Sequence, residues 1–409
     1  MQPGGVQPGK VAATNSVTGL ESRERVRGFE LAAGLSVLFM ILVHDLWHWG
    51  SPDTWTTPIG TVISLFGGPT ATPVFLFVVG ASLAFSPSTG FGSLAARGAW
   101  LVVLGYLLNI LRGVLPASLG MATDVVTQAQ IEPFTPWWLL TSVDLHHVTG
   151  LSLVALAALR VWRRPGWSWL LLAAAIAAAE PLVHGLNFGT PLLDAPLTPV
   201  IGGAPNVFYA VVPWVAYALL GAVFGRLLVA SPDRRRFFRV GALIGLGLVG
   251  ISAVMVVATQ PTFDVYTYWQ GPPAFVVGIV GIVLVWLALC DAVSRRAVLR
   301  VPLRVVDYWG ERVIPMYFMH WIVVGWGCAV VGFRDLSLPA VLIASSTAVV
   351  LTTYLARFAI GLEGAPWRSR RLRRLLGRDP DAAEANDGPA TSIVPALAFA
   401  EVPMELDDR

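Results

Sequence analysis

The stretch Leu35-Ser36-Val37-Leu38-Phe39-Met40-Ile41-Leu42-Val43, which ends at His44, decides the fold class of this chain. It lies inside a longer apolar run, and a helix of about 20 such residues spans the roughly 30 Å of hydrocarbon in a bilayer. Similar runs recur along the chain. We therefore predict an all-α, polytopic integral membrane protein with about ten transmembrane helices. The predicted spans are 29 to 48, 59 to 85, 96 to 115, 138 to 161, 167 to 184, 208 to 230, 240 to 259, 274 to 293, 313 to 332 and 338 to 360.

The composition agrees with this interpretation. Of the 409 residues, 55% are hydrophobic and only 13% are charged, whereas soluble domains average about 25% charged residues. The formal net charge of +3 is too balanced to indicate a nucleic-acid partner. Two cysteines are too few for a disulfide scaffold or a four-thiolate zinc site.

The basic residues predict the topology, because positively charged loops stay cytoplasmic. With both termini inside, every basic residue except Arg112 and Arg334 falls on the inner side. We expect a cytoplasmic segment at 1–28, a transmembrane domain at 29–360, and a basic, then disordered, cytoplasmic tail at 361–409. Lys10 is the single lysine among the 28 basic residues, a bias that suggests a GC-rich genome and a bacterial plasma membrane.

Histidines gather at the predicted outer ends of the spans, where ionisable groups are costly and often functional. His44 and His48 share a helix face, as do Glu180 and His184. Asp144 and His147 are three residues apart and share another. Each histidine can also be an interfacial residue bonded to water, but five of the six lie on this side. The five are His44, His48, His146, His147 and His184.

His44 is the sharpest catalytic candidate. A neutral imidazole at this depth can remove a proton from a hydroxyl or amine. We expect a carboxylate from another helix to orient or charge-balance it, with Asp144 as the first choice and Glu180 as the second.

Several other residues and segments each have two possible roles. The segment 67–73 contains two prolines, which predicts a broken helix lining a cavity or a packed proline kink. Arg112, beside Asn109, can hold an anionic substrate group or pair with an outer carboxylate. Arg97 can meet a donor phosphate or act as a topological anchor. His320 can be a buried hydrogen-bonded ring or part of the site.

The order of several short motifs resembles the transmembrane acyltransferases, especially bacterial relatives of heparan-alpha-glucosaminide N-acetyltransferase. The resemblance covers roughly residues 25 to 330. Its motifs are Arg27-Gly28-Phe29-Glu30-Leu31-Ala32-Ala33-Gly34 through His44, Pro73 to Gly80, Arg97 to Asn109, Val143-Asp144-Leu145-His146 with Gly150, Pro213-Trp214 with Gly221 and Gly225, and Gly310 through Tyr317 to His320.

The resemblance implies transfer of an acyl group from cytosolic acyl-CoA, as co-substrate, to a hydroxyl or amine of a sugar, lipid or small natural product. The family's histidine at the end of the first span maps onto His44. We expect Arg97 to bind the donor and no metal to be involved. The expected substrate-binding residues are His48, His147, His184, Arg112, Asn109, Tyr317 and His320.

Three other functions stay open. Asp144 or Glu180 can serve as the acid of a lipid or isoprenoid cyclisation without CoA. The histidines can bind a metal. The charged groups can form a proton relay in a transporter, although no inverted repeat is visible. The expected partners are a small or lipid-linked acceptor and the bilayer, with a homodimer as an open option and no nucleic acid.

Overall fold

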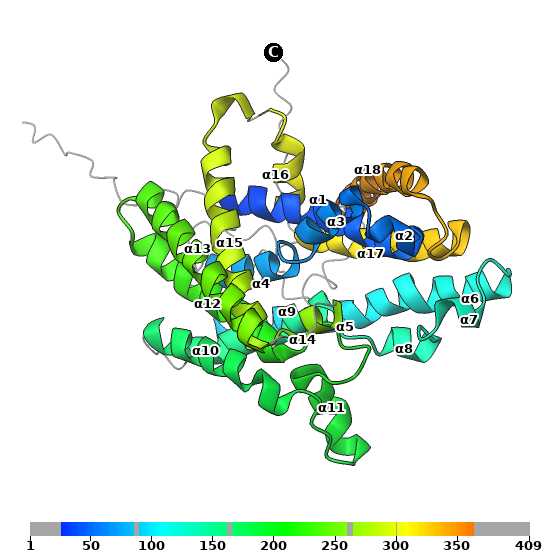
Figure 1. Ribbon diagram of the computed structural model, residues 1–409, viewed down its shortest axis with the longest axis horizontal. Helices are drawn as coiled ribbons and strands as arrows, with labels where there is room; N and C mark the ends of the chain where they lie inside the picture. Colours follow the sequence, from blue (N-terminus) through cyan, green and yellow to red (C-terminus); the bar gives the residue numbers. More distant parts are fainter. Residues whose placement is uncertain (1–25, 86–89, 162–165, 260–264, 300, 364–409) are drawn as a thin grey trace, which may run out of the picture.

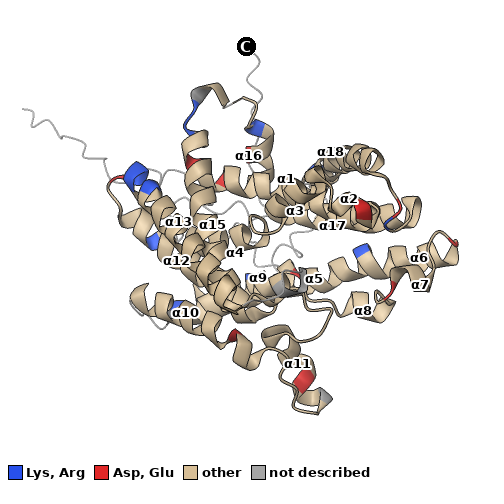
Figure 2. Cartoon of the chain, in the orientation of Figure 1, with Lys and Arg blue, Asp and Glu red and all other residues tan. Residues whose placement is uncertain are grey.

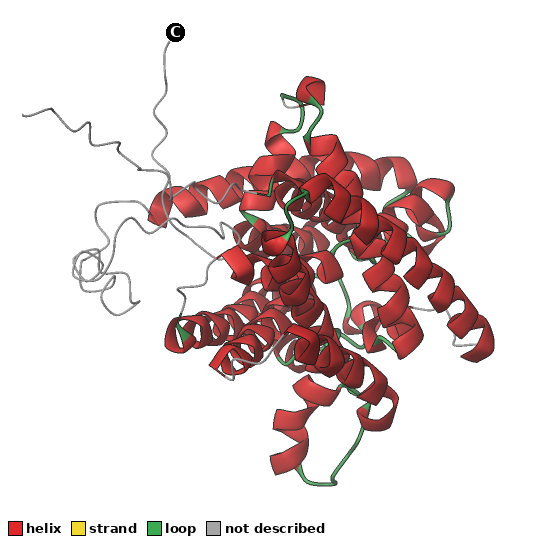
Figure 3. Ribbon diagram, turned by 90° about the vertical axis from the view of Figure 1, so that its left-hand side faces the viewer, coloured by secondary structure: helices red, strands yellow, loops and turns green. Residues whose placement is uncertain are grey.

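The computed structural model describes residues 26–85, 90–161, 166–259, 265–299 and 301–363. These residues form helices, with no β-strand among them (Figures 1 and 3). The expected cytoplasmic segments at both ends lie almost entirely outside the described residues. The helices are α1 (Arg27–Trp49), α2 (Pro52–Trp55), α3 (Pro58–Gly67), α4 (Thr72–Ser82), η1 (Leu83–Phe85), α5 (Phe91–Asn109), η2 (Ile110–Val114), α6 (Leu115–Ala122), α7 (Gln128–Ile131), α8 (Pro136–Leu140), α9 (Leu145–Val161), α10 (Gly166–Val183), α11 (Pro191–Ile201), α12 (Val211–Ala230), α13 (Arg234–Thr259), α14 (Val265–Gln270), α15 (Pro273–Ser294), η3 (Ala297–Leu299), α16 (Arg304–Glu311), α17 (Val313–Val331) and α18 (Leu338–Glu363).

The helix lengths confirm a polytopic all-α membrane protein. Within the described ranges, nine helices are long and apolar enough to cross a bilayer. The predicted span at 138 to 161 is α9, a helix of 17 residues that follows the separate short helix α8. The predicted span at 96 to 115 is longer than expected, because α5, η2 and α6 continue as one unit of 32 residues.

Helix α1 lies at the centre of the assembly. It packs against α3, α4, α15, α16, α17 and α18, and most of its residues are buried (Figure 1). Glycines allow the closest of these contacts. A Cβ atom added at Gly34 would lie 1.9 Å from the Val306 carbonyl oxygen, and one added at Gly310 would lie 1.8 Å from the Glu30 carbonyl oxygen. The α1 and α16 backbones therefore touch directly, which fixes the position of α1 and of the histidines it carries.

The predicted break in the second span is present. Helix α3 ends at Gly67 and α4 begins at Thr72. Two side chains meet the carbonyls that the break frees: the Ser36 hydroxyl donates to the Thr70 oxygen, and the Tyr268 hydroxyl donates to the Gly68 oxygen over 2.9 Å. Side chains of the protein thus supply hydrogen bonds to these two carbonyl oxygens, as is required of backbone groups within a bilayer. None of these residues lines the cavity described below.

Basic residues cluster at two of the connections between helices. Figure 2 shows basic residues at the start of α13 and around the connection from α15 to α16. Ion pairs join neighbouring helices here. Arg27 of α1 pairs with Asp307 of α16 (2.6 Å), and Arg234 of α13 pairs with Asp291 of α15 (3.5 Å). Arg112 belongs to a different element, the η2 turn of the long unit formed by α5, η2 and α6.

Candidate active site

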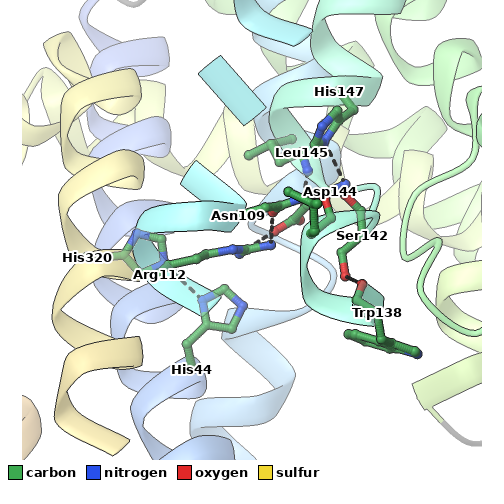
Figure 4. Close-up of polar contacts among 10 residues, drawn as sticks. His44, Asn109, Arg112, Trp138, Ser142, Asp144, Leu145, His147 and His320 are labelled. Carbon is green, nitrogen blue, oxygen red and sulfur yellow. Dashed lines mark hydrogen bonds and ion pairs between the residues drawn. The ribbon is translucent and has the colours of Figure 1, made fainter. Parts of the chain in front are cut away.

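Four elements bring polar side chains together within the helical bundle. They are the second half of α1, the π-helical turn η2, the start of α9 and the middle of α17 (Figure 4). A π-turn inside an α-helix widens the backbone by one residue and is frequent at functional sites. Here it contains Arg112.

A pair of imidazoles forms the centre of this group. The Nδ1 atom of His44 lies 3.1 Å from the Nε2 atom of His320, and the two rings stack with centroids 5.3 Å apart. His320 is completely buried. One turn along α1, the Nδ1 atom of His48 lies 2.9 Å from the His44 carbonyl oxygen. A carbonyl only accepts hydrogen bonds, so His48 carries its proton on Nδ1 in the neutral form and its Nε2 atom is an acceptor.

Trp321 connects the imidazoles to Arg112. The His44 ring stacks on Trp321 at a centroid distance of 4.2 Å, and the Arg112 Cζ atom lies 4.2 Å from the centroid of the Trp321 ring. The sequence interpretation did not select Trp321. Its position directly after His320 was the available signal, but an aromatic residue in an apolar span usually indicates packing or anchoring.

Arg112 pairs with Asp144, as one of its two predicted roles requires. Their closest nitrogen and oxygen atoms are 2.6 Å apart, and both side chains are more than nine-tenths buried. Burial is the largest single influence and would raise the pKa of the Asp144 carboxyl, but the Arg112 guanidinium and the hydrogen bonds from Tyr317 and the Leu145 amide together outweigh it, so the pKa is lower than usual. Asp144 is therefore ionised at neutral pH. The Tyr317 hydroxyl adds a further hydrogen bond to this carboxylate.

Asn109 holds this ion pair in place. Its Oδ1 atom accepts a hydrogen bond from Arg112 over 3.2 Å, and its Nδ2 atom donates to the Leu140 and Ser142 carbonyls over 3.0 and 2.7 Å. It thus ties η2 to the connection between α8 and α9, where Asp144 lies.

The two histidines after Asp144 have separate surroundings. The Asp144 amide donates to the His147 Nδ1 atom over 3.1 Å, and the His147 ring lies against Gly105 and Tyr106 of α5. The His146 ring lies 4.7 Å from Tyr317 on α17. Asp144 and His147 do lie together, as their spacing predicts, but the bond uses the Asp144 backbone while its carboxylate faces Arg112.

A cavity of about 120 Å³ adjoins this group. His48, Arg112 and Trp321 form part of its wall, and η2, α6, α8 and α17 supply most of the rest. His44 lies one turn deeper, behind His48. The imidazole pair is thus next to a space that can admit part of a substrate.

Other predicted site residues lie elsewhere. Glu180 and His184 contact each other on and just after α10, with Nδ1 and Oε1 3.6 Å apart, and burial lowers the pKa of His184. Arg97 is exposed on α5. Among the described residues, the structure shows no bond from His44 to Asp144 or Glu180. The partner that sequence reasoning expected to be a carboxylate is instead His320, because α17 places its ring against α1 at this depth.

Comparison with known families gives one match. The family described as heparan-alpha-glucosaminide N-acetyltransferase, catalytic, matches residues 25–255. A search of curated proteins finds no match. The matched region includes His44, Arg112 and Asp144, whereas His320 and Trp321 on α17 lie beyond it. Since the match covers more than half of the 409 residues, the chain belongs to the heparan-alpha-glucosaminide N-acetyltransferase catalytic-domain family and is a multi-pass membrane protein.

Proposed function

We propose that this protein transfers an acyl group from acyl-CoA to a hydroxyl or amine acceptor at the His44 site. Membership of an N-acetyltransferase family supports acyl transfer as the reaction class. The observation on which the assignment depends is the His44–His320 pair, which holds one imidazole of α1 in a defined orientation next to a cavity.

In this mechanism His44 is the general base. With its Nδ1–H donating to His320 Nε2, the His44 Nε2 atom has a free lone pair that can take the acceptor's proton. The acceptor oxygen or nitrogen then bonds to the thioester carbonyl carbon, and the carbon–sulfur bond breaks. The CoA thiolate leaves and takes the proton from the His44 imidazolium, so His44 returns to its neutral form.

Arg112 is suited to stabilise the negative charge that develops on the carbonyl oxygen. Its guanidinium has five N–H donors, and the contacts with Asp144 and Asn109 occupy two nitrogen atoms. Donors aimed at developing charge in a dry site are a large source of catalysis. Asp144 would hold the guanidinium in place and balance its charge, so this carboxylate would act on His44 only through Arg112 and Trp321.

The ion pair also bears on the alternative of acid-initiated cyclisation. Such a reaction needs a protonated carboxyl to deliver a proton, and Arg112 keeps Asp144 ionised. Glu180, the other carboxyl considered as the acid, is not among the residues that line the cavity, so we favour acyl transfer.

We further propose how the protein is oriented in the membrane and which membrane it occupies. The basic ends of the helices would face the cytoplasm, as positively charged segments do, with both termini on that side and the site nearer the outer face. A bacterial plasma membrane fits the arginine-rich composition. The catalytic unit would be 29–360, because α17 supplies His320 to the site.

A His44→Ala variant tests the proposal. Purified protein in lipid nanodiscs is given acetyl-CoA with primary amine and alcohol acceptors, and release of the free CoA thiol is measured. We expect a loss of about 100-fold or more, the usual contribution of a general base. Leu42→Ala, on the same helix, is the matched control and should keep its activity. Full acyl transfer by a correctly inserted His44→Ala protein would remove His44 from the mechanism.

A further inference from the structure

The cavity next to His48 is lined mostly by apolar side chains. Six aromatic or imidazole rings and a set of aliphatic side chains form it, and Ser142 is its only hydroxyl-bearing residue. The Ser142 hydroxyl already donates to the Trp138 carbonyl oxygen over 2.8 Å. The wall contains no Asp, Glu, Asn or Gln side chain. The six rings are those of His48, Phe134, Trp138, Phe208, Trp321 and Phe333.

The aromatic residues hold one another in place. Phe134 meets Trp138 edge to face with ring centroids 4.8 Å apart, and it meets Phe333 in the same way at 5.9 Å. Phe208 contacts Trp138 at 5.6 Å. Edge-to-face pairs of this kind are favourable and rigid. The apolar surface is thus formed before a ligand arrives, and a ligand need not order it.

The wall carries few polar side-chain groups: those of Arg112 and His48, the Ser142 hydroxyl, the Cys328 thiol and the indole N–H groups of Trp138 and Trp321. Arg112 and His48 belong to the catalytic group, and the Trp321 ring contacts both of them as well as His44. The His48 Nε2 atom is an acceptor, because Nδ1 is bonded to the His44 carbonyl. A hydroxyl or amine that enters the cavity can therefore donate its hydrogen to His48 while the rest of the molecule contacts a mainly apolar wall.

A sugar is a poor match for these walls. Each buried hydroxyl needs a hydrogen-bond partner, and leaving one without a partner is unfavourable. A hexose has several hydroxyls, and the wall offers few groups to receive them. The volume of about 120 Å³ is close to the roughly 150 Å³ of apolar cavities that bind benzene.

We infer that this cavity is the acceptor subsite, and that it takes an alcohol or amine attached to one small apolar group, such as a single aromatic ring or a chain of a few carbons. His48 positions the reacting hydroxyl or amine. This inference rests on the proposed acyl transfer and adds to it the class of acceptor.

Filling the cavity tests the inference. Ala117 of α6 lines the cavity, and Ala117→Phe would occupy it. Ala122, at the exposed end of the same helix, lies outside the wall, and Ala122→Phe is the matched control. Acetyl transfer to benzyl alcohol, benzylamine and glucosamine is measured in nanodiscs as thiol release. Binding of benzyl alcohol without donor is measured by tryptophan fluorescence.

We expect kcat/KM for benzyl alcohol or benzylamine to exceed that for glucosamine at least tenfold. Ala117→Phe should lower it at least tenfold and weaken benzyl alcohol binding, whereas Ala122→Phe should do neither. Equal or better use of glucosamine, or no response to Ala117→Phe, would overturn the acceptor assignment and leave acyl transfer intact.

Two further outcomes have separate meanings. If Ala117→Phe changes only the preference between acetyl-CoA and butyryl-CoA, the cavity holds the donor's acyl chain and the inference is wrong. If no acceptor is acylated but benzyl alcohol binds and Ala117→Phe alone blocks it, the proposed reaction fails while the apolar binding site stands.

Discussion

The His44 Nδ1 and His320 Nε2 atoms lie 3.1 Å apart although 276 residues separate them in the chain. Buried imidazoles at this distance share a hydrogen bond, so each restricts the tautomer and the orientation of the other. Helix α17 thereby takes part in the site even though it lies outside the region matched by the family.

His320 should act by positioning His44. His320→Leu removes the acceptor for His44 Nδ1–H and should lower kcat at least tenfold with little change in the acceptor KM. His320→Gln keeps a polar group near the position of Nε2 and should recover much of kcat. The check is steady-state kinetics of both variants. Equal losses in the Gln and Leu variants would point to packing as the role of this side chain.

The Arg112–Asp144 pair should matter for stability as well as for activity. Asp144→Asn leaves the buried Arg112 charge without compensation, and breaking a buried pair from one side typically costs about 3 to 5 kcal/mol. Thermal unfolding in nanodiscs measures this loss. Asp53→Asn is the control, because it changes an exposed carboxylate on α2. It should shift the unfolding temperature by no more than about a degree or two.

The same pair predicts an acid-sensitive part of that stability. The pKa of Asp144 is lowered in the folded protein, so its contribution is fully present above the unfolded pKa of about 3.9 and is lost as the pH falls through the folded pKa. The stability difference between the natural protein and Asp144→Asn should be constant from about pH 7 to pH 5 and shrink below about pH 4. A difference that instead vanishes between pH 7 and 6 would show that Asp144 is not the titrating group.

Gly105 should be required for the placement of His147. A Cβ atom there would lie 2.6 Å from the His147 Cε1 atom, so Gly105→Ala must displace the ring or the helix, at a cost of about 1 to 3 kcal/mol. Gly92 is on the same helix and has open space around it, so Gly92→Ala should be neutral or stabilising by up to about 1 kcal/mol. Comparing the two unfolding temperatures isolates the contact, and equal shifts would contradict the close approach of Gly105 to His147.

Much of the fold could be predicted because its signals are local. The length of an apolar run determines whether it can cross a bilayer, and nine helices of sufficient length are present in the described residues. The break near Pro73 was predictable for the same reason, since proline removes a backbone donor wherever it occurs. Pairing with an outer carboxylate was one of the two roles that the sequence left open for Arg112, and the structure shows this pairing with Asp144.

The composition of the site depended on tertiary structure. Sequence spacing places His44 and His48 on one helix face, but it does not specify which face of α17 meets them or at what depth. The contact of His44 with His320, the contacts of Trp321 with both His44 and Arg112, and the separate position of Glu180 follow from how the helices are rotated and packed. Those choices are made by close contacts such as Gly34 with Val306, which depend on residues far apart in the chain and therefore have no local signature.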